Sequence, residues 1–294
     1  MYVYLNNGVV KSSDAKISIF DHGFLYGDGI FETMRAYEGV IFMFEKHLNR
    51  LYRSASLIGL DIQRSVSDIK IAIYETLHAN SLTNAYVRVS ISRGYGPVGI
   101  DPDLCKESTF VIIANEFKNY PNTYFENGIS LMVSSVKRNH PEALNPQIKS
   151  MNFLNNILAK IESKKTGAME AIMLNYKGFV AECTVSNIFF VIDEVLCTPS
   201  ISCGILDGIT RETVIEIALR NGLRVLEGEL KIDDLFKASE VFITNTSMEL
   251  MPVSKIEYKK FSVGDIYKLL RTKFKEEVEI YVKEKKSESL SLWK

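Results

Sequence analysis

The chain is poor in cysteine and has almost no excess charge of either sign. Its four cysteines among 294 residues lie far apart or in no ligand-type spacing, so we expect reduced thiols in a cytoplasmic protein with no disulfide framework and no metal site. The 35 basic and 36 acidic residues give a formal net charge of -1, which argues against binding to nucleic acid or to an anionic membrane. No apolar run is long enough to cross a bilayer, and no signal-peptide pattern is present. The remaining composition, 46% hydrophobic and 24% charged, is typical of a globular enzyme.

The first part of the chain combines strand and helix patterns, and we predict a small N-terminal α+β domain at residues 1–116. An Asn-Gly pair between apolar runs favours a hairpin at 2–10. Apolar residues at helical spacing predict a helix near 48–58, and a second helix is expected from Ser67, as its N-cap, to about Asn80. The predicted strands are 2–5, 30–37, 40–42, 87–91 and 109–114.

A polar stretch that contains Pro121 and has no clear periodicity follows this domain. We predict a linker at 117–127 and a larger C-terminal α/β domain at 128–294. Its predicted strands are 129–136, 171–174, 188–191 and 241–244, and its predicted helices are 153–164, 210–220 and a helix from 263 onward. The polar tail from Lys283 is expected to fray.

Two residues are candidates for a reactive centre. Lys149 follows a turn-rich segment and directly precedes a predicted helix. A lysine in such a place is most often a solvated surface residue, but one shielded in a cleft becomes nucleophilic and can form a Schiff base. Glu182 follows a short apolar strand, so it is either an edge carboxylate that faces water or a buried group that needs a cationic partner. A protonated pyridine nitrogen would be such a partner.

Other positions could bind a phosphate. The segment 208–210 begins a predicted helix, which is either an ordinary capped start or a set of free N–H groups that face an anion. Thr246 and Ser247 follow a predicted strand and could add donors from a second loop. Arg50 lies in the first predicted helix, where an exposed arginine is the usual case, although a guanidinium fork suits a phosphate dianion.

A tyrosine and an arginine share one face of a predicted strand. Tyr86 and Arg88 are two residues apart, so their side chains point the same way. Such a pair suits the bidentate binding of a substrate carboxylate, although a solvent-facing pair on a half-buried sheet would have the same pattern. The combination of lysine, carboxylate, arginine and two phosphate loops indicates pyridoxal phosphate as the cofactor.

Together these residues resemble the class IV (fold type IV) pyridoxal phosphate enzymes. That family contains branched-chain aminotransferases, D-amino acid aminotransferases and aminodeoxychorismate lyases. The segment 182–211 carries the likeness in residue types and in gaps, and the likeness extends over nearly the whole chain. It implies a small α+β domain and a larger α/β domain, usually in a homodimer or a higher homo-oligomer. The resemblance implies that the cofactor is bound by Arg50, Lys149, Glu182, Gly208, Ile209, Thr210 and Thr246.

By the same likeness Lys149 is the catalytic residue, because it would be joined covalently to the cofactor and would move the substrate proton. Residues 26–32 resemble the entry motif of the branched-chain branch, and 86–88 resembles its carboxylate-binding pair. The implied substrate-binding residues are Tyr26, Phe31, Tyr86, Arg88 and Ser247.

Two positions depart from that branch. Thr33 stands where a glycine is typical, and Phe153 stands where a tyrosine typically hydrogen-bonds the cofactor's phenolic oxygen. Apart from these two positions the resemblance holds, and it implies an aminotransferase that moves an amino group between glutamate and a 2-oxo acid with a branched side chain. A D-amino acid aminotransferase, an aminodeoxychorismate lyase and a non-catalytic protein that keeps the fold are the alternatives.

Overall fold

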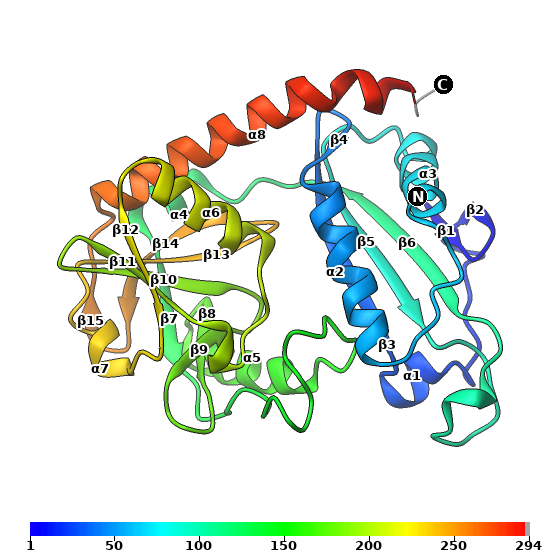
Figure 1. Ribbon diagram of the computed structural model, residues 1–294, viewed down its shortest axis with the longest axis horizontal. Coiled ribbons are helices and arrows are strands. Elements are labelled where there is room, and N and C mark those ends of the chain that lie inside the picture. The colour runs from blue at the N-terminus through cyan, green and yellow to red at the C-terminus, as the bar shows by residue number, and fades with distance from the viewer. Residues whose placement is uncertain (292–294) are drawn as a thin grey trace. The chain divides into compact units, whose positions relative to one another are not determined.

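The computed structural model describes residues 1–291, and Figure 1 shows the course of the chain. These residues form two compact units, and each unit is assembled from parts of the chain that are separated in the sequence. Unit 1 comprises residues 1–118, 148–153 and the chain from 278, and unit 2 comprises 119–147 and 154–277. Lys149 therefore belongs to unit 1, with the N-terminal part of the chain.

Unit 1 is built on a six-stranded antiparallel sheet with the strand order β2-β1-β6-β5-β3-β4. Its strands are β1 (Tyr2–Leu5), β2 (Gly8–Lys11), β3 (Gly29–Tyr37), β4 (Val40–Ile41), β5 (Ala85–Ser92) and β6 (Thr109–Glu116). Its helices are α1 (His22–Tyr26), α2 (Phe44–Leu57), α3 (Val66–Ala79) and the short 3-10 helix Pro102–Leu104. The predicted hairpin at 2–10 and the two predicted helices of this unit are confirmed as elements.

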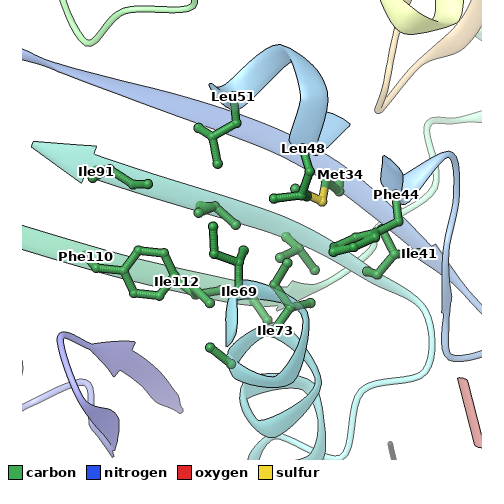
Figure 2. Packing of buried hydrophobic residues seen from close by; sticks show 14 of the residues in the cluster. Met34, Ile41, Phe44, Leu48, Leu51, Ile69, Ile73, Ile91, Phe110 and Ile112 are labelled. Atoms are coloured by element: carbon green, nitrogen blue, oxygen red, sulfur yellow. The ribbon is translucent and has the colours of Figure 1, made fainter. Parts of the chain in front are cut away.

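Helices α2 and α3 cover one face of this sheet. Alternate residues of β3, β5 and β6 point towards the two helices, and their apolar side chains form one buried cluster. Figure 2 shows Leu48 and Leu51 of α2 and Ile69 and Ile73 of α3 in this apolar layer. The remaining residues of each strand, among them those on either side of Glu32 in β3, point to the opposite face.

Two details of unit 1 differ from the prediction. The N-cap of α3 is Ser65 rather than Ser67, because Ser65 and Asp68 form a capping box in which each side chain binds the other's backbone N–H. The C-terminal tail does not fray from Lys283, since α8 (Asp265–Ser291) stays helical and its last turns belong to unit 1. There the Ser289 hydroxyl donates to the carbonyl of Gly39 at 2.7 Å.

Unit 2 is built on a mixed sheet in which β12, β11, β10, β13, β14, β7, β8 and β9 lie in that order and β15 pairs with β14. Its strands are β7 (Ile129–Val133), β8 (Glu170–Leu174), β9 (Val180–Cys183), β10 (Asn187–Ile192), β11 (Val195–Pro199), β12 (Arg224–Gly228), β13 (Glu240–Asn245), β14 (Glu249–Ile256) and β15 (Lys259–Lys260). Its helices are α4 (Asn122–Asn127), α5 (Leu154–Thr166), the 3-10 helix Ile201–Cys203, α6 (Ile209–Arg220), α7 (Ile232–Leu235) and the first part of α8.

The segment 117–127, where we predicted a linker, contains helix α4 (Asn122–Asn127). Pro121 is the N-cap of this helix, and Gly128 ends it with a positive φ of 74°. Short polar helices of this kind have little internal periodicity, so the sequence pattern could not identify it. Within residues 1–291, no helix combines the length and the apolar character that a membrane span needs.

Candidate active site

Lys149 lies in a short segment that packs beside β3 in unit 1. Its carbonyl accepts a hydrogen bond from the N–H of Phe31 at 2.9 Å, and its own N–H donates to the hydroxyl of Ser54 in α2 at 3.2 Å. The next residue, Ser150, forms a bridge with Ile30. Because the backbone of Lys149 is bonded on both sides, its side chain starts from a fixed position.

The ring of Phe31 contacts two cationic side chains. The Lys149 Nζ lies 4.6 Å from its centroid, and the Arg88 Cζ lies 3.8 Å from it. Arg88 also donates from Nε to the Ser90 hydroxyl at 3.1 Å, and the ring of Phe153 meets Phe31 edge-on at 5.5 Å. The structure thus brings an amine, a guanidinium and two aromatic rings together on the face of β3 and β5 that α2 and α3 leave uncovered.

Tyr86 shares this face with Arg88, as the strand alternation predicted. Burial raises the pKa of the Tyr86 phenol, and the charge of Arg88 and a hydrogen bond with it offset only part of that rise. Tyr26 lies on α1, where its hydroxyl accepts a hydrogen bond from the N–H of Gly99 at 2.9 Å and its ring meets His22 edge-on. Tyr26 therefore has contacts of its own, with the loop that follows β5.

Helix α2 buries a polar stripe beside its apolar one. The polar stripe consists of His47, Arg50 and Ser54, which follow one another at helical spacing. Glu32 of β3 faces this stripe and is fully buried. Its Oε1 accepts from Arg50 Nε at 2.6 Å, and its Oε2 accepts from Arg50 Nη2 at 2.9 Å and from His47 Nδ1 at 2.8 Å.

The surroundings lower the pKa of both Glu32 and His47. Burial alone would raise the pKa of Glu32, but the charge of Arg50 and the hydrogen bonds from His47 and Arg50 outweigh it and hold that pKa far below its usual range. Burial lowers the pKa of His47, and the charges of Arg50 and Lys149 lower it further against the pull of Glu32. Lys149 is therefore close enough to the polar stripe to act on it electrostatically.

Unit 2 surrounds Glu182 with three hydrogen-bond donors. The carboxylate lies in β9 and accepts from Arg138 Nε at 2.8 Å, from the N–H of Leu206 at 3.0 Å and from Asn187 Nδ2 at 3.3 Å. Arg138 also donates from Nη1 to Asn155 Oδ1 at 3.2 Å, so the guanidinium is fixed in turn. An ionised carboxylate has about four acceptor sites, so these three donors leave capacity for one more, such as a protonated ring nitrogen.

The start of α6 presents backbone donors next to this carboxylate. Gly208 is the N-cap and has no side chain with which to cap the N–H groups of Ile209 and Thr210. Asn187 connects the two features, because its Nδ2 donates both to Glu182 and to the carbonyl of Leu206. The structure therefore brings Glu182 and the start of α6 together.

The second loop follows the strand that neighbours Asn187. Asn187 of β10 pairs with Thr244 of β13, which ends at Asn245. The Oδ1 of Asn245 accepts from the N–H of Ser247 at 2.9 Å and from that of Met248 at 2.7 Å. These bonds fix the turn that contains Thr246 and Ser247.

Replacing Gly208 with alanine is expected to lower the free energy of unfolding by about 1–3 kcal/mol, because the site has no room for a methyl group. A Cβ at this position would lie 2.0 Å from Asn187 Oδ1, and Asn187 cannot move without losing its bonds to Glu182 and Leu206. Urea unfolding of both variants measures the effect. Gly8→Ala is the matched control, since nothing lies within 4 Å of its added Cβ. Equal stability of the two variants would contradict the prediction.

Several of the polar residues around Glu32 and around Glu182 were not identified from the sequence. Glu32 could have been, because strand alternation places it on the buried face of β3, where a carboxylate needs a counter-charge. His47 could have been, because it lies three residues before Arg50 on one helix. No local signal indicates Arg138, which meets Glu182 across 44 positions of sequence.

The donor set fits pyridoxal phosphate. Unit 1 supplies an amine, Lys149, and a guanidinium with a fixed geometry, Arg50. Unit 2 supplies a carboxylate with spare acceptor capacity, Glu182, and the N-terminus of α6 for a phosphate.

Comparison with known proteins gives concordant matches. The model of the family "Amino-transferase class IV" matches residues 29–256. The chain is 44% identical to a putative branched-chain-amino-acid aminotransferase of Methanocaldococcus jannaschii over 94% of this chain and 96% of that protein. An aminodeoxychorismate lyase of Bacillus subtilis (34% identical, 96% and 97% covered) and a D-alanine aminotransferase of Listeria monocytogenes (34% identical, 87% and 88% covered) are also similar.

Solved structures agree with these matches. The branched-chain amino acid aminotransferase of Escherichia coli superposes with a TM-score of 0.89 at 30% identity, covering 93% of each chain. The T.th. branched-chain amino acid aminotransferase with pyridoxamine 5'-phosphate superposes with a TM-score of 0.88 at 31% identity, covering 96% of this chain and 92% of that one. The predicted mixed fold of helices and sheets is thereby confirmed.

Proposed function

The chain belongs to the class IV aminotransferase family, and from this premise we propose that it moves an amino group between glutamate and a branched-chain 2-oxo acid. It is a pyridoxal phosphate-dependent enzyme. The observation that carries the substrate proposal is the contact of both Arg88 and Lys149 with the ring of Phe31. A guanidinium near the reactive amine suits a substrate carboxylate, and the rings of Phe31 and Phe153 suit an apolar side chain.

The contacts of the residues support the roles that we propose for them. When bound, pyridoxal phosphate supplies an electron sink for the charge that develops when the Cα–H bond of the amino acid breaks. Lys149 Nζ would hold the cofactor covalently and would move the proton from the substrate Cα. Glu182 would accept a hydrogen bond from the protonated ring nitrogen, and Arg138 and Asn187 orient its carboxylate.

Arg50 and the start of α6 are the groups that we propose for the phosphate. Arg50 contributes a guanidinium, and the N–H groups of Ile209 and Thr210 contribute the positive end of α6. Thr246 adds a donor from the turn after β13. Arg88 and Tyr86 orient the substrate carboxylate, with Tyr26 and Ser247 as further substrate contacts.

The assembly that we propose is a homodimer or a higher homo-oligomer. Unit 1 exposes large apolar side chains on α1 and on the loop after β5, including Phe24, Val98 and Ile100, which are 68%, 71% and 89% exposed. Exposed apolar groups of this kind are typical of surfaces that contact another protein. Light scattering of the purified protein measures the mass, and a monomer at micromolar concentration would contradict this part of the proposal.

A panel of 2-oxo acids with glutamate as the donor tests the substrate proposal. We expect the highest kcat/KM for 2-oxo acids with branched aliphatic side chains, and chiral analysis of the product distinguishes an L from a D product. Preference for pyruvate with a D product would support a D-alanine aminotransferase instead, the activity named for one of the relatives.

An aminodeoxychorismate lyase is the second candidate, because a relative with that name is 34% identical over nearly its whole length. Incubation with aminodeoxychorismate and no amino acceptor distinguishes the two activities. Release of pyruvate under those conditions would support the lyase, and no release together with transamination of branched-chain 2-oxo acids would support the aminotransferase.

Replacing Arg88 with glutamine is expected to raise the KM for the amino acid by about 10- to 100-fold while changing kcat less, because the lost bond is charge-assisted and forms in the ground state. Steady-state kinetics with both substrates measure the split. Arg64→Gln is the matched control, since Arg64 also stacks on a phenylalanine of unit 1, at 4.6 Å from the Phe110 centroid. An unchanged KM in the Arg88 variant would remove Arg88 from the substrate site.

A further inference from the structure

We infer that Glu32 is a positioning residue that fixes the guanidinium of Arg50 for the phosphate of the cofactor, with His47 as the second partner of Glu32. The inference rests on the proposed function only in that Arg50 binds the phosphate. Glu32 itself would not touch the cofactor, because both of its oxygens are bonded to residues of the polar stripe of α2.

The geometry of the Glu32–Arg50 pair restricts the arginine at two points. Glu32 takes the Nε–H and one Nη2–H, so the plane of the guanidinium is set by a bidentate contact. These are two of the five N–H groups of an arginine, and the others lie on edges that face away from Glu32. A flexible side chain thereby becomes a rigid fork, and the entropy that a mobile arginine would lose on binding an anion is lost at folding instead.

Stability alone does not explain this buried pair. An ion pair in an apolar interior adds little to stability, because desolvation offsets the Coulombic gain. Glu32 is fully buried, on the face of β3 that also carries Met34 of the apolar cluster. A carboxylate in that position is more readily explained by what it does to Arg50 than by its contribution to folding.

The identity of residue 47 is consistent with this role. Oε2 of Glu32 has a second acceptor site, and a histidine fills it without adding a charge, because burial lowers the pKa of His47. A lysine or arginine there would form a competing ion pair with Glu32. With a neutral His47, the one carboxylate Glu32 is matched by Arg50, and Lys149 adds a further cation near an expected dianion.

Two effects of the substitution Glu32→Gln have opposite signs, which makes the inference testable. Removing a negative charge near a phosphate site would strengthen anion binding if charge alone mattered. Removing one arm of the bidentate contact would weaken binding if the orientation of Arg50 mattered. The direction of the change in affinity therefore distinguishes positioning from simple electrostatics.

The experiment measures the dissociation constants of pyridoxal phosphate and of pyridoxal for the full-length apoprotein by fluorescence titration. Both compounds can react with Lys149, so the ratio of the two constants isolates the phosphate. We expect Glu32→Gln to raise the dissociation constant of pyridoxal phosphate by about 10-fold or more and to leave that of pyridoxal unchanged. The affinity for inorganic phosphate, measured by calorimetry, should also fall.

Matched variants separate the possible failures. Arg50→Ala must lower the affinity for pyridoxal phosphate relative to the affinity for pyridoxal. If it does not, the proposed phosphate site itself is wrong. If Arg50→Ala weakens it and a folded Glu32→Gln protein binds it as tightly as the wild type or more tightly, only the present inference is overturned. In the Arg50→Ala background Glu32→Gln should cause no further loss, because Glu32 acts through Arg50. Glu240→Gln, which removes another buried carboxylate from unit 2, controls for general effects on folding.

A pair of variants at position 47 covers the case in which Glu32→Gln does not fold. His47→Asn keeps a donor near the position of Nδ1 and should bind pyridoxal phosphate like the wild type. His47→Leu removes the donor, so we expect the affinity for pyridoxal phosphate to fall a few-fold and the affinity for pyridoxal to stay unchanged. Equal affinities of the two variants for pyridoxal phosphate would overturn the inference.

Discussion

Turnover is expected to fall by at least about 10⁴-fold when Lys149 is replaced with alanine, because one side chain supplies both the covalent attachment and the proton transfer. The fold should survive the change, since the hydrogen bonds of Lys149 with Phe31 and Ser54 are made by its backbone. Steady-state transamination measures the rate, and borohydride reduction followed by peptide mapping measures whether the cofactor is attached at this position.

The control for this variant is another lysine with no assigned role. Lys165 is exposed in the last turn of α5, and Lys165→Ala should keep the wild-type rate. The reduced adduct should appear on the peptide that contains Lys149 in the wild type and in the control. An adduct on a different lysine, or retained turnover in Lys149→Ala, would refute the assignment.

The second large effect is expected for Glu182→Gln, which should lower kcat by about 10²- to 10³-fold. A neutral amide no longer stabilises the proton on the ring nitrogen, and the electron sink weakens as a result. The structure adds a second reason. Arg138, Asn187 and Leu206 all donate to this carboxylate, so the NH₂ group of a glutamine would meet donors where the glutamate offers acceptors.

Glu170→Gln is the matched control for Glu182→Gln. Glu170 is a buried carboxylate in the neighbouring strand β8. Its Oε1 accepts hydrogen bonds from the N–H and the hydroxyl of Thr184 and from the N–H of Ala171. Both variants should lose stability in urea, but only Glu182→Gln should lose kcat at saturating cofactor and substrate. Equal losses of kcat would mean that Glu182 has no specific part in the chemistry.

The sequence revealed those parts of the site whose signals are local. Lys149 and Gly208 each come shortly before a helix, and Glu182 lies in a short apolar strand. Such patterns can be recognised within ten residues. Tyr86 and Arg88 were placed on one face by alternation along a single strand, which the structure confirms. The roles of these residues in catalysis and binding stay predictions.

What could not be predicted depends on contacts between distant positions. Arg138 reaches Glu182 across 44 positions, and Ser289 reaches Gly39 across 250. The tail was expected to fray because its sequence is polar, and only the contact with the hairpin of β3 and β4 explains why it stays helical. The N-cap of α3 was misplaced by two residues because two serines flank Val66, and the reciprocal bond with Asp68 decides between them.

The discontinuity of unit 1 has a consequence for the order in which the chain folds during synthesis. A fragment ending at Lys118 would contain the six-stranded sheet but neither the edge segment with Lys149 nor the last turns of α8. The N-terminal part can therefore form its sheet on the ribosome but cannot be completed until the last helix has been translated. Lys149 reaches its place beside β3 only after the segment 148–153 has been translated.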